Sequence, residues 1–206
     1  MAYKTLTRAA LVAGLAVGAA FSATAADEPK TMMGADAAML SNTCAGCHGT
    51  NGNSMGPAAP SIAGLSPTYF EETMVGFASG DIPSTIMTRI AKGYTEDEIK
   101  AMAKFYAGQS FVKAKQSFDA NLASKGAKLH DKYCEKCHAD GGQSAEDDAG
   151  VLAGQWTPYV NWTLADYKAG DREATKKMKK KLSELLEREG SDGVIALLNF
   201  YASQQK

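Results

Sequence analysis

The chain has 206 residues, four cysteines and a formal net charge of −1, and 45% of its residues are hydrophobic. A chain of this length forms one large domain or two small ones. The near-balanced charge, and a lysine run without interleaved aromatic residues, exclude nucleic acid as an expected partner.

The N-terminus has the layout of a secretory signal peptide. Two basic residues precede an apolar run at 9–21, which leads into small residues at 22–26. The run is shorter than the roughly 20 residues of a membrane span. We therefore predict a signal peptide over residues 1–26, cleaved near Ala25 or Ala26, and an exported mature protein that does not span the membrane.

The pentapeptide Cys-x-x-Cys-His occurs twice, 90 residues apart, and accounts for all four cysteines. Its haem-binding residues are Cys44, Cys47 and His48 in the first copy, and Cys134, Cys137 and His138 in the second. Two thiols one helical turn apart can each add to a haem vinyl group, and the following imidazole can bind the iron. Redox dithiols and zinc sites share the Cys-x-x-Cys spacing, but zinc needs four ligands, which neither half offers locally. With the export signal, the motifs predict two covalently attached haem c groups.

Signals for helix starts recur at matching places, whereas strand-like alternation is scarce. The signals are Ser66 before Pro67, Thr157 before Pro158, and a capping box of Thr95 with Glu98. We therefore predict an all-α chain.

The second half of the chain repeats the first. A shift of 90 residues aligns the haem motifs and the segments after them, and a shift of 95 aligns 105–107 with 200–202. A duplicated unit with about five inserted residues in its second copy explains both shifts. Units this small bury little apolar core unaided, and a haem compensates for that. The predicted first unit, with a short leader and a connector, is 27–112, and the second is 113–206.

The sixth ligand of each iron decides between an electron carrier and a catalyst. Met178 is the one methionine C-terminal to His138, and within the repeat only Met87 has a methionine partner, at a shift of 91. Met178 lies in the lysine run 176–181, where a single inward-pointing methionine would meet the haem. The other methionines assigned to core packing are Met39, Met74 and Met102.

Two groups of side chains could contact the haem in more than one way. His130, four residues before Cys134, could compete as an axial ligand or bond a haem propionate, but a partly exposed helix histidine is favoured. Four aromatic residues follow the haem motifs and could pack on the macrocycle or bond propionates: Tyr69, Trp156, Tyr159 and Trp162.

Four segments resemble the cytochrome subunits of flavocytochrome c sulfide dehydrogenases, which are class I dihaem cytochromes. The segments are 87–94, 132–138, 152–159 and 200–205. The similarity extends over essentially the whole mature chain. It implies two tandem class I cytochrome c domains, each wrapped around one haem, with His48 and Met87 on the first iron and His138 and Met178 on the second.

The resemblance also implies a second contact to the proximal imidazole. Pro57 stands where class I cytochromes often place a proline whose carbonyl orients this ring, and Asp147 stands at the equivalent position of the second unit.

The function implied by the resemblance is that of a periplasmic electron-transfer subunit that is not an enzyme by itself. It would accept electrons from a sulfide-oxidising, FAD-containing flavoprotein and pass them to a soluble cytochrome. A free dihaem carrier that feeds a terminal oxidase has the same fold and ligands, so it stays an alternative. A dihaem peroxidase needs one iron with an open position, which paired methionine ligands disfavour.

Overall fold

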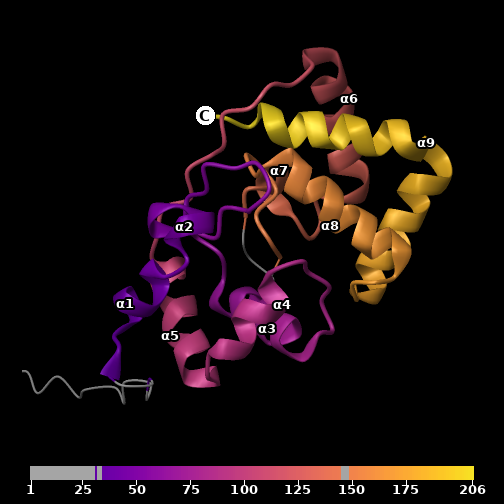
Figure 1. The fold of residues 1–206 in the computed structure, drawn as a ribbon. Coiled ribbons are helices and arrows are strands. Elements are labelled where there is room, and N and C mark those ends of the chain that lie inside the picture. The colour runs from indigo at the N-terminus through magenta and orange to yellow at the C-terminus, as the bar shows by residue number, and fades with distance from the viewer. Residues whose placement is uncertain (1–30, 32–33, 145–148) are drawn as a thin grey trace, which may run out of the picture.

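The structure is a computed structural model that describes residue 31 and residues 34–144 and 149–206. The predicted signal peptide and Asp147 lie outside the described residues. Within them the chain is helical and contains no strand, which confirms the all-α prediction. None of the described helices is long and apolar enough to cross a membrane. Figure 1 shows the first half of the chain in indigo to magenta beside the second half in orange to yellow.

The first half surrounds one apolar core. Its elements are α1 (Ala37–Asn42), α2 (Ala45–His48), η2 (Thr50–Gly52), α3 (Pro67–Ser79), α4 (Met87–Ile90), η3 (Ala91–Gly93) and α5 (Glu96–Ala107). Met74 and Met102 are buried in this core, as predicted. Met39 is 63% exposed, so its assignment to the core was wrong. The short helix α1 turns Leu40 and Ser41 inward and leaves Met39 on its outer side.

The second half is built around a helix pair. Its elements are α6 (Ala120–Tyr133), α7 (Ala139–Gly142), α8 (Thr157–Ala169) and α9 (Lys176–Ser203). The pair α6 and α9 buries Leu129, Tyr133, Leu197 and Tyr201. Gly190 interrupts α9 with φ 63°, a conformation that suits glycine, and the yellow helix changes direction along its length in Figure 1.

Two of the three predicted helix starts are confirmed. Ser66 caps α3 by accepting the N–H of Tyr69, and Thr95 with Glu98 forms the capping box of α5. Thr157 is not an N-cap, because it is the first residue of α8. Its N–H and hydroxyl both donate to the side-chain oxygen of Gln116, a connector residue that takes over the capping role.

The repeat is visible in the backbone hydrogen bonds of the turns after the haem motifs. The carbonyl of Gly52 accepts from the N–H groups of residues 62 and 63, and the carbonyl of Gly142 accepts from those of 152 and 153. A Cβ on Gly52 would lie 2.8 Å from the Tyr106 ring, and one on Gly142 would lie 3.2 Å from the Tyr201 ring. The same glycine turn is therefore packed under the same tyrosine in both halves.

The two halves touch through a buried amide. The Gln155 side chain is 3% exposed, accepts the N–H of Ser61 at 2.9 Å and donates to the carbonyl of Ser61 at 2.8 Å. The neighbouring Trp156 donates its ring N–H to the carbonyl of Ser54 at 3.1 Å. These bonds give the halves a defined mutual orientation.

Candidate haem-binding sites

The imidazole of His48 is held in one tautomer. Its Nδ1 lies 2.8 Å from the carbonyl oxygen of Pro60. Because a carbonyl oxygen only accepts, Nδ1 carries the proton and the Nε2 lone pair points elsewhere. Burial lowers the pKa of His48, although the bond to Pro60 acts in the opposite direction. A neutral imidazole with a basic Nε2 is the form that binds haem iron.

The prediction that the Pro57 carbonyl orients this ring was wrong. Pro57 is exposed, and the loop places Pro60, three residues later, against His48. The loop turns outward at Met55, which is 88% exposed, and returns before Ser61, which is 2% exposed. A proline near this spacing was therefore the right type of residue at the wrong position.

Within the described residues, no disulfide joins the cysteines of either motif. Cys44 and Cys134 are half-buried, whereas Cys47 and Cys137 are exposed. Burial raises the pKa of the Cys134 thiol. The absence of a disulfide within either pair leaves each sulfur able to form a thioether.

The second motif holds its histidine differently. Burial lowers the pKa of His138 as it does that of His48. The Nδ1 of His138 is buried, yet it forms no hydrogen bond with any described residue. Gly150, at the repeat position of Pro60, has its carbonyl near enough to raise the pKa but outside hydrogen-bond geometry.

The two methionines assigned to the irons both lie at the start of a helix. Met87 is the first residue of α4, is half-buried and packs against the first core. Met178 is the third residue of α9, where Thr175 accepts its N–H. Its side chain is half-buried, whereas all five lysines of 176–181 are exposed. Met178 thus turns inward from the basic run, and the ligand role of both methionines stays a prediction.

His130 contradicts its favoured interpretation as a partly exposed residue. The side chain is fully buried, with Nε2 at 2.6 Å from Glu135 Oε2 and Nδ1 at 3.0 Å from the Tyr201 hydroxyl. Both ring nitrogens are thus engaged by the protein, because α9 covers the face of α6 that carries His130.

A buried cation between the halves suits the charge of a haem. Arg172 is 6% exposed and donates to the Tyr69 hydroxyl at 3.4 Å, and its guanidinium carbon lies 5.2 Å from the centre of the Tyr167 ring. Among the described residues no carboxylate forms an ion pair with it. A buried charge is costly without an opposite one. Haem carries two propionate carboxylates, which could supply the charge that Arg172 lacks. The neutral imidazoles of His48 and His138 fit the haem iron in the same way.

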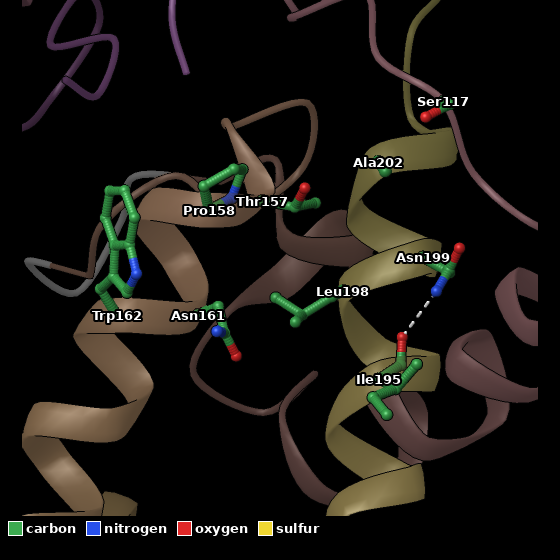
Figure 2. Close-up of a pocket in the computed structure, with 9 residues that line it drawn as sticks. All are labelled: Ser117, Thr157, Pro158, Asn161, Trp162, Ile195, Leu198, Asn199 and Ala202. Atoms are coloured by element: carbon green, nitrogen blue, oxygen red, sulfur yellow. Dashed lines mark hydrogen bonds between the residues drawn. The ribbon is translucent and has the colours of Figure 1, made fainter. Parts of the chain in front are cut away.

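Trp162 lines a groove on the second half. It is 52% exposed, and the groove of about 520 Å³ lies between α8 and α9, where Asn161, Ile195 and Leu198 also line it (Figure 2). Its contact with a haem stays a prediction.

The contacts between the halves were not expected from the sequence. Gln155 and Arg172 belong to no motif, and their repeat positions hold Leu65 and Ile82. The loss of an apolar residue at two repeat positions was the available signal, because a polar side chain there must find a partner when the halves meet.

Fold and sites together define a c-type cytochrome with two haems. No family model matches the chain. It is 49% identical over 72 residues to the cytochrome subunit of sulfide dehydrogenase of Chlorobaculum tepidum, which covers 35% of this chain and 64% of that protein. It is 30% identical over 145 residues to cytochrome c4 of Thiocapsa roseopersicina, covering 66% of this chain and 74% of that protein. The chain belongs to the cytochrome c4 family of dihaem electron carriers.

A solved structure shows the same fold. Reduced recombinant cytochrome c4 from Pseudomonas stutzeri superposes with a TM-score of 0.68 at 24% identity, covering 82% of this chain and 98% of the other. This confirms two tandem class I cytochrome c folds. The family carries two covalently bound haem c groups, as the sequence predicted, and its members act in electron transfer.

Proposed function

We propose that the chain is the periplasmic electron-transfer subunit of a sulfide-oxidising complex. It accepts electrons from an FAD-containing flavoprotein and passes them to a soluble cytochrome. The similarity to a sulfide dehydrogenase cytochrome subunit, at 49% identity over 72 residues, carries this proposal. That match spans less than two thirds of the relative, so we propose the flavoprotein partner and the sulfide substrate and do not take them from the match alone. Export after cleavage of residues 1–26 places haem attachment and electron transfer in the periplasm.

Each half contributes one covalent site in this proposal, with the boundary between residues 112 and 113. Cys44 and Cys47 bind the first haem, and Cys134 and Cys137 bind the second. Burial lowers the pKa of both proximal histidines and so favours the neutral imidazole that binds iron, which supports these assignments.

The axial ligands make the chain a carrier. A bound haem iron supplies one-electron chemistry by cycling between ferric and ferrous states. In the first half, His48 and Met87 would hold this iron, and a thioether beside an imidazole would raise the reduction potential and leave no position for substrate. His138 and Met178 would hold the iron of the second half in the same way. The protein therefore holds the redox group and excludes other ligands without making or breaking substrate bonds.

Surface charge supports two different docking faces. Residues 27–112 contain 5 basic and 9 acidic residues, whereas residues 113–206 contain 15 and 14. The basic residues of the second half include the exposed run around Met178. An acidic lobe beside a lobe with a basic helix can orient on a donor at one side and on an acceptor at the other.

A free carrier that delivers electrons to a terminal oxidase is the second candidate. The match to cytochrome c4 covers 66% of this chain, against 35% for the sulfide dehydrogenase subunit, and this broader coverage favours it. The two candidates share fold, cofactors and ligands, and they differ in a permanent flavoprotein partner.

The test is purification of the exported, tagged chain from its own host, followed by anaerobic titration with sulfide. The proposal predicts that FAD and a second polypeptide copurify with the chain, and that sulfide reduces the haems within this complex. Dithionite reduction of the same sample provides the control for redox-competent haem.

The isolated chain, freed of its partner, is the matched negative control and should stay oxidised by sulfide. A preparation that contains redox-competent haem but neither flavin nor a sulfide response would contradict the complex and leave the free carrier.

A further inference from the structure

The carboxylate of Glu135 connects the two ends of the second haem motif. Glu135 lies between Cys134 and Cys137, but its oxygens accept the backbone N–H groups of Asp140 at 3.0 Å and Gly141 at 3.1 Å. These donors lie two and three residues after His138 in the sequence. The side chain therefore bridges the turn that carries the proximal histidine.

The carboxylate is itself anchored to a buried side chain. Its Oε2 lies 2.6 Å from Nε2 of His130, which is fully buried in α6. The other nitrogen of His130 lies 3.0 Å from the hydroxyl of Tyr201 in α9. The carboxylate accepts from Nε2–H of the imidazole, and Nδ1 shares a hydrogen bond with the tyrosine hydroxyl. This hydrogen-bonded chain links both helices of the second core to the haem turn.

The turn after His138 has a left-handed backbone. Asp140, Gly141 and Gly142 follow one another with φ of 56°, 67° and 87°. Asp140 is the one residue of the three that is not a glycine, and the N–H groups of Asp140 and Gly141 converge on one anion. Glu135 is that anion.

The first haem motif lacks this arrangement. At a shift of 90, Ala45 replaces Glu135 and Leu40 replaces His130. The Tyr106 hydroxyl, the counterpart of that of Tyr201, donates instead to the carbonyl of Ser41. There the proximal imidazole is fixed directly, by the Pro60 carbonyl on Nδ1 of His48.

We infer that Glu135, backed by His130, is the positioning residue that fixes the orientation of His138 in the second half. With no hydrogen bond on Nδ1 from the described residues, the His138 ring depends on the backbone that holds it. The second half thus holds its proximal histidine through a clamped turn that the first half lacks. This inference rests on the proposed role of His138 as an iron ligand.

The test compares Glu135→Ala and Glu135→Gln in the exported holoprotein. Separate reduction potentials of the two haems are measured by spectroelectrochemistry, and the ferric ligand field of each by electron paramagnetic resonance. We expect both signals of the second haem to shift in Glu135→Ala, and to a smaller extent in Glu135→Gln, which keeps one acceptor. The first haem is an internal control and should not change. Lys136→Gln, at an exposed position between the same cysteines, is the matched surface control.

A purely structural role gives a different result. If the variants unfold at lower temperature but keep the ligand-field signature and potential of the second haem, the positioning role is overturned. If Glu135→Ala does not accumulate, Glu135→Gln and His130→Gln decide by the same two readouts. Neither readout involves sulfide or a flavoprotein, so the complex can be disproved without affecting this result.

Discussion

At the scale of single residues, burial separates the methionines that fill a core from those that can bind iron. Met74 and Met102 are enclosed by the first core, whereas Met55 is 88% exposed. Met87 and Met178 lie between these extremes, each half-buried at the start of a helix. A thioether that binds haem needs this position, with one face toward the cofactor and its backbone fixed by a cap.

Replacement of Met178 by alanine should leave one coordination position of the second iron open. We expect the weak methionine-to-iron absorption of the oxidised protein to fall by about half, since one of two ligands is lost. The reduced variant should also bind carbon monoxide at one haem. Met55→Leu is the control, because an exposed methionine should leave both signals unchanged. An unaltered methionine band in Met178→Ala would exclude Met178 as a ligand.

Single-residue assignments could be made from the sequence where the repeat fixes the spacing, and these assignments stay predictions. The Cys-x-x-Cys-His motifs and the Met87 and Met178 pair follow from the repeat alone. The contacts of His130 and Pro60 were not predictable, because they depend on how loops and helices pack across the core. His130 is buried by α9, where its hydrogen-bond partner Tyr201 lies 71 residues further along the chain.

At the scale of elements, the crossing of α6 and α9 organises the second half. Gly126 lies where the helices meet, and a Cβ there would overlap the Ala196 carbonyl oxygen and lie 2.8 Å from Cβ of Phe200. Glycine is needed at this position for close approach, since it is inside α6 and its φ is an ordinary helical one.

The variant Gly126→Ala should therefore force α6 and α9 apart. Overpacking of a tight contact costs about 1–3 kcal/mol, which exceeds the gain in helix propensity from alanine. Thermal unfolding of the holoprotein should shift downward. Gly93→Ala is the matched control, because no atom lies within 4 Å of the added Cβ. Equal melting temperatures for the two variants would contradict the close-packed crossing.

Helix prediction succeeded where local chemistry decides and failed where a distant residue intervenes. Ser66 caps α3 as its sequence predicts. At the start of α8, which is the repeat of α3, the connector residue Gln116 accepts the N–H of Thr157 and takes the place of the predicted Thr157 cap. The inserted residues of the second unit lie within α9, which runs from Lys176 to Ser203 across the break at Gly190. The change in repeat spacing from 90 to 95 residues indicated the insertion, but it did not indicate that the inserted residues would lie within a helix.

At the scale of the whole molecule, polar contacts between the halves hold the two haem sites in one arrangement. Gln155 bonds both backbone groups of Ser61, Trp156 bonds Ser54, and Arg172 contacts Tyr69. Each pair joins the second half to the first. An electron that enters one half and leaves by the other benefits from this fixed geometry.

The variant Gln155→Ala should uncouple the halves. It leaves the buried N–H and carbonyl of Ser61 without partners, at about 1–3 kcal/mol for each unsatisfied group. We expect calorimetry of the holoprotein to show two unfolding transitions where the natural protein shows one. Gln109→Ala, which removes a bond inside the first half, is the control and should keep a single transition. One unchanged transition in Gln155→Ala would contradict the coupling.

The central claim is that the chain carries two haems, each with a histidine and a methionine ligand, for electron transfer. Spectroelectrochemical titration of the exported holoprotein, followed by exposure of the reduced form to carbon monoxide, tests it most directly. We expect two one-electron steps per chain, a methionine band on both oxidised haems, and no carbon monoxide adduct. A single haem per chain, or a carbon monoxide adduct at either iron, would contradict it.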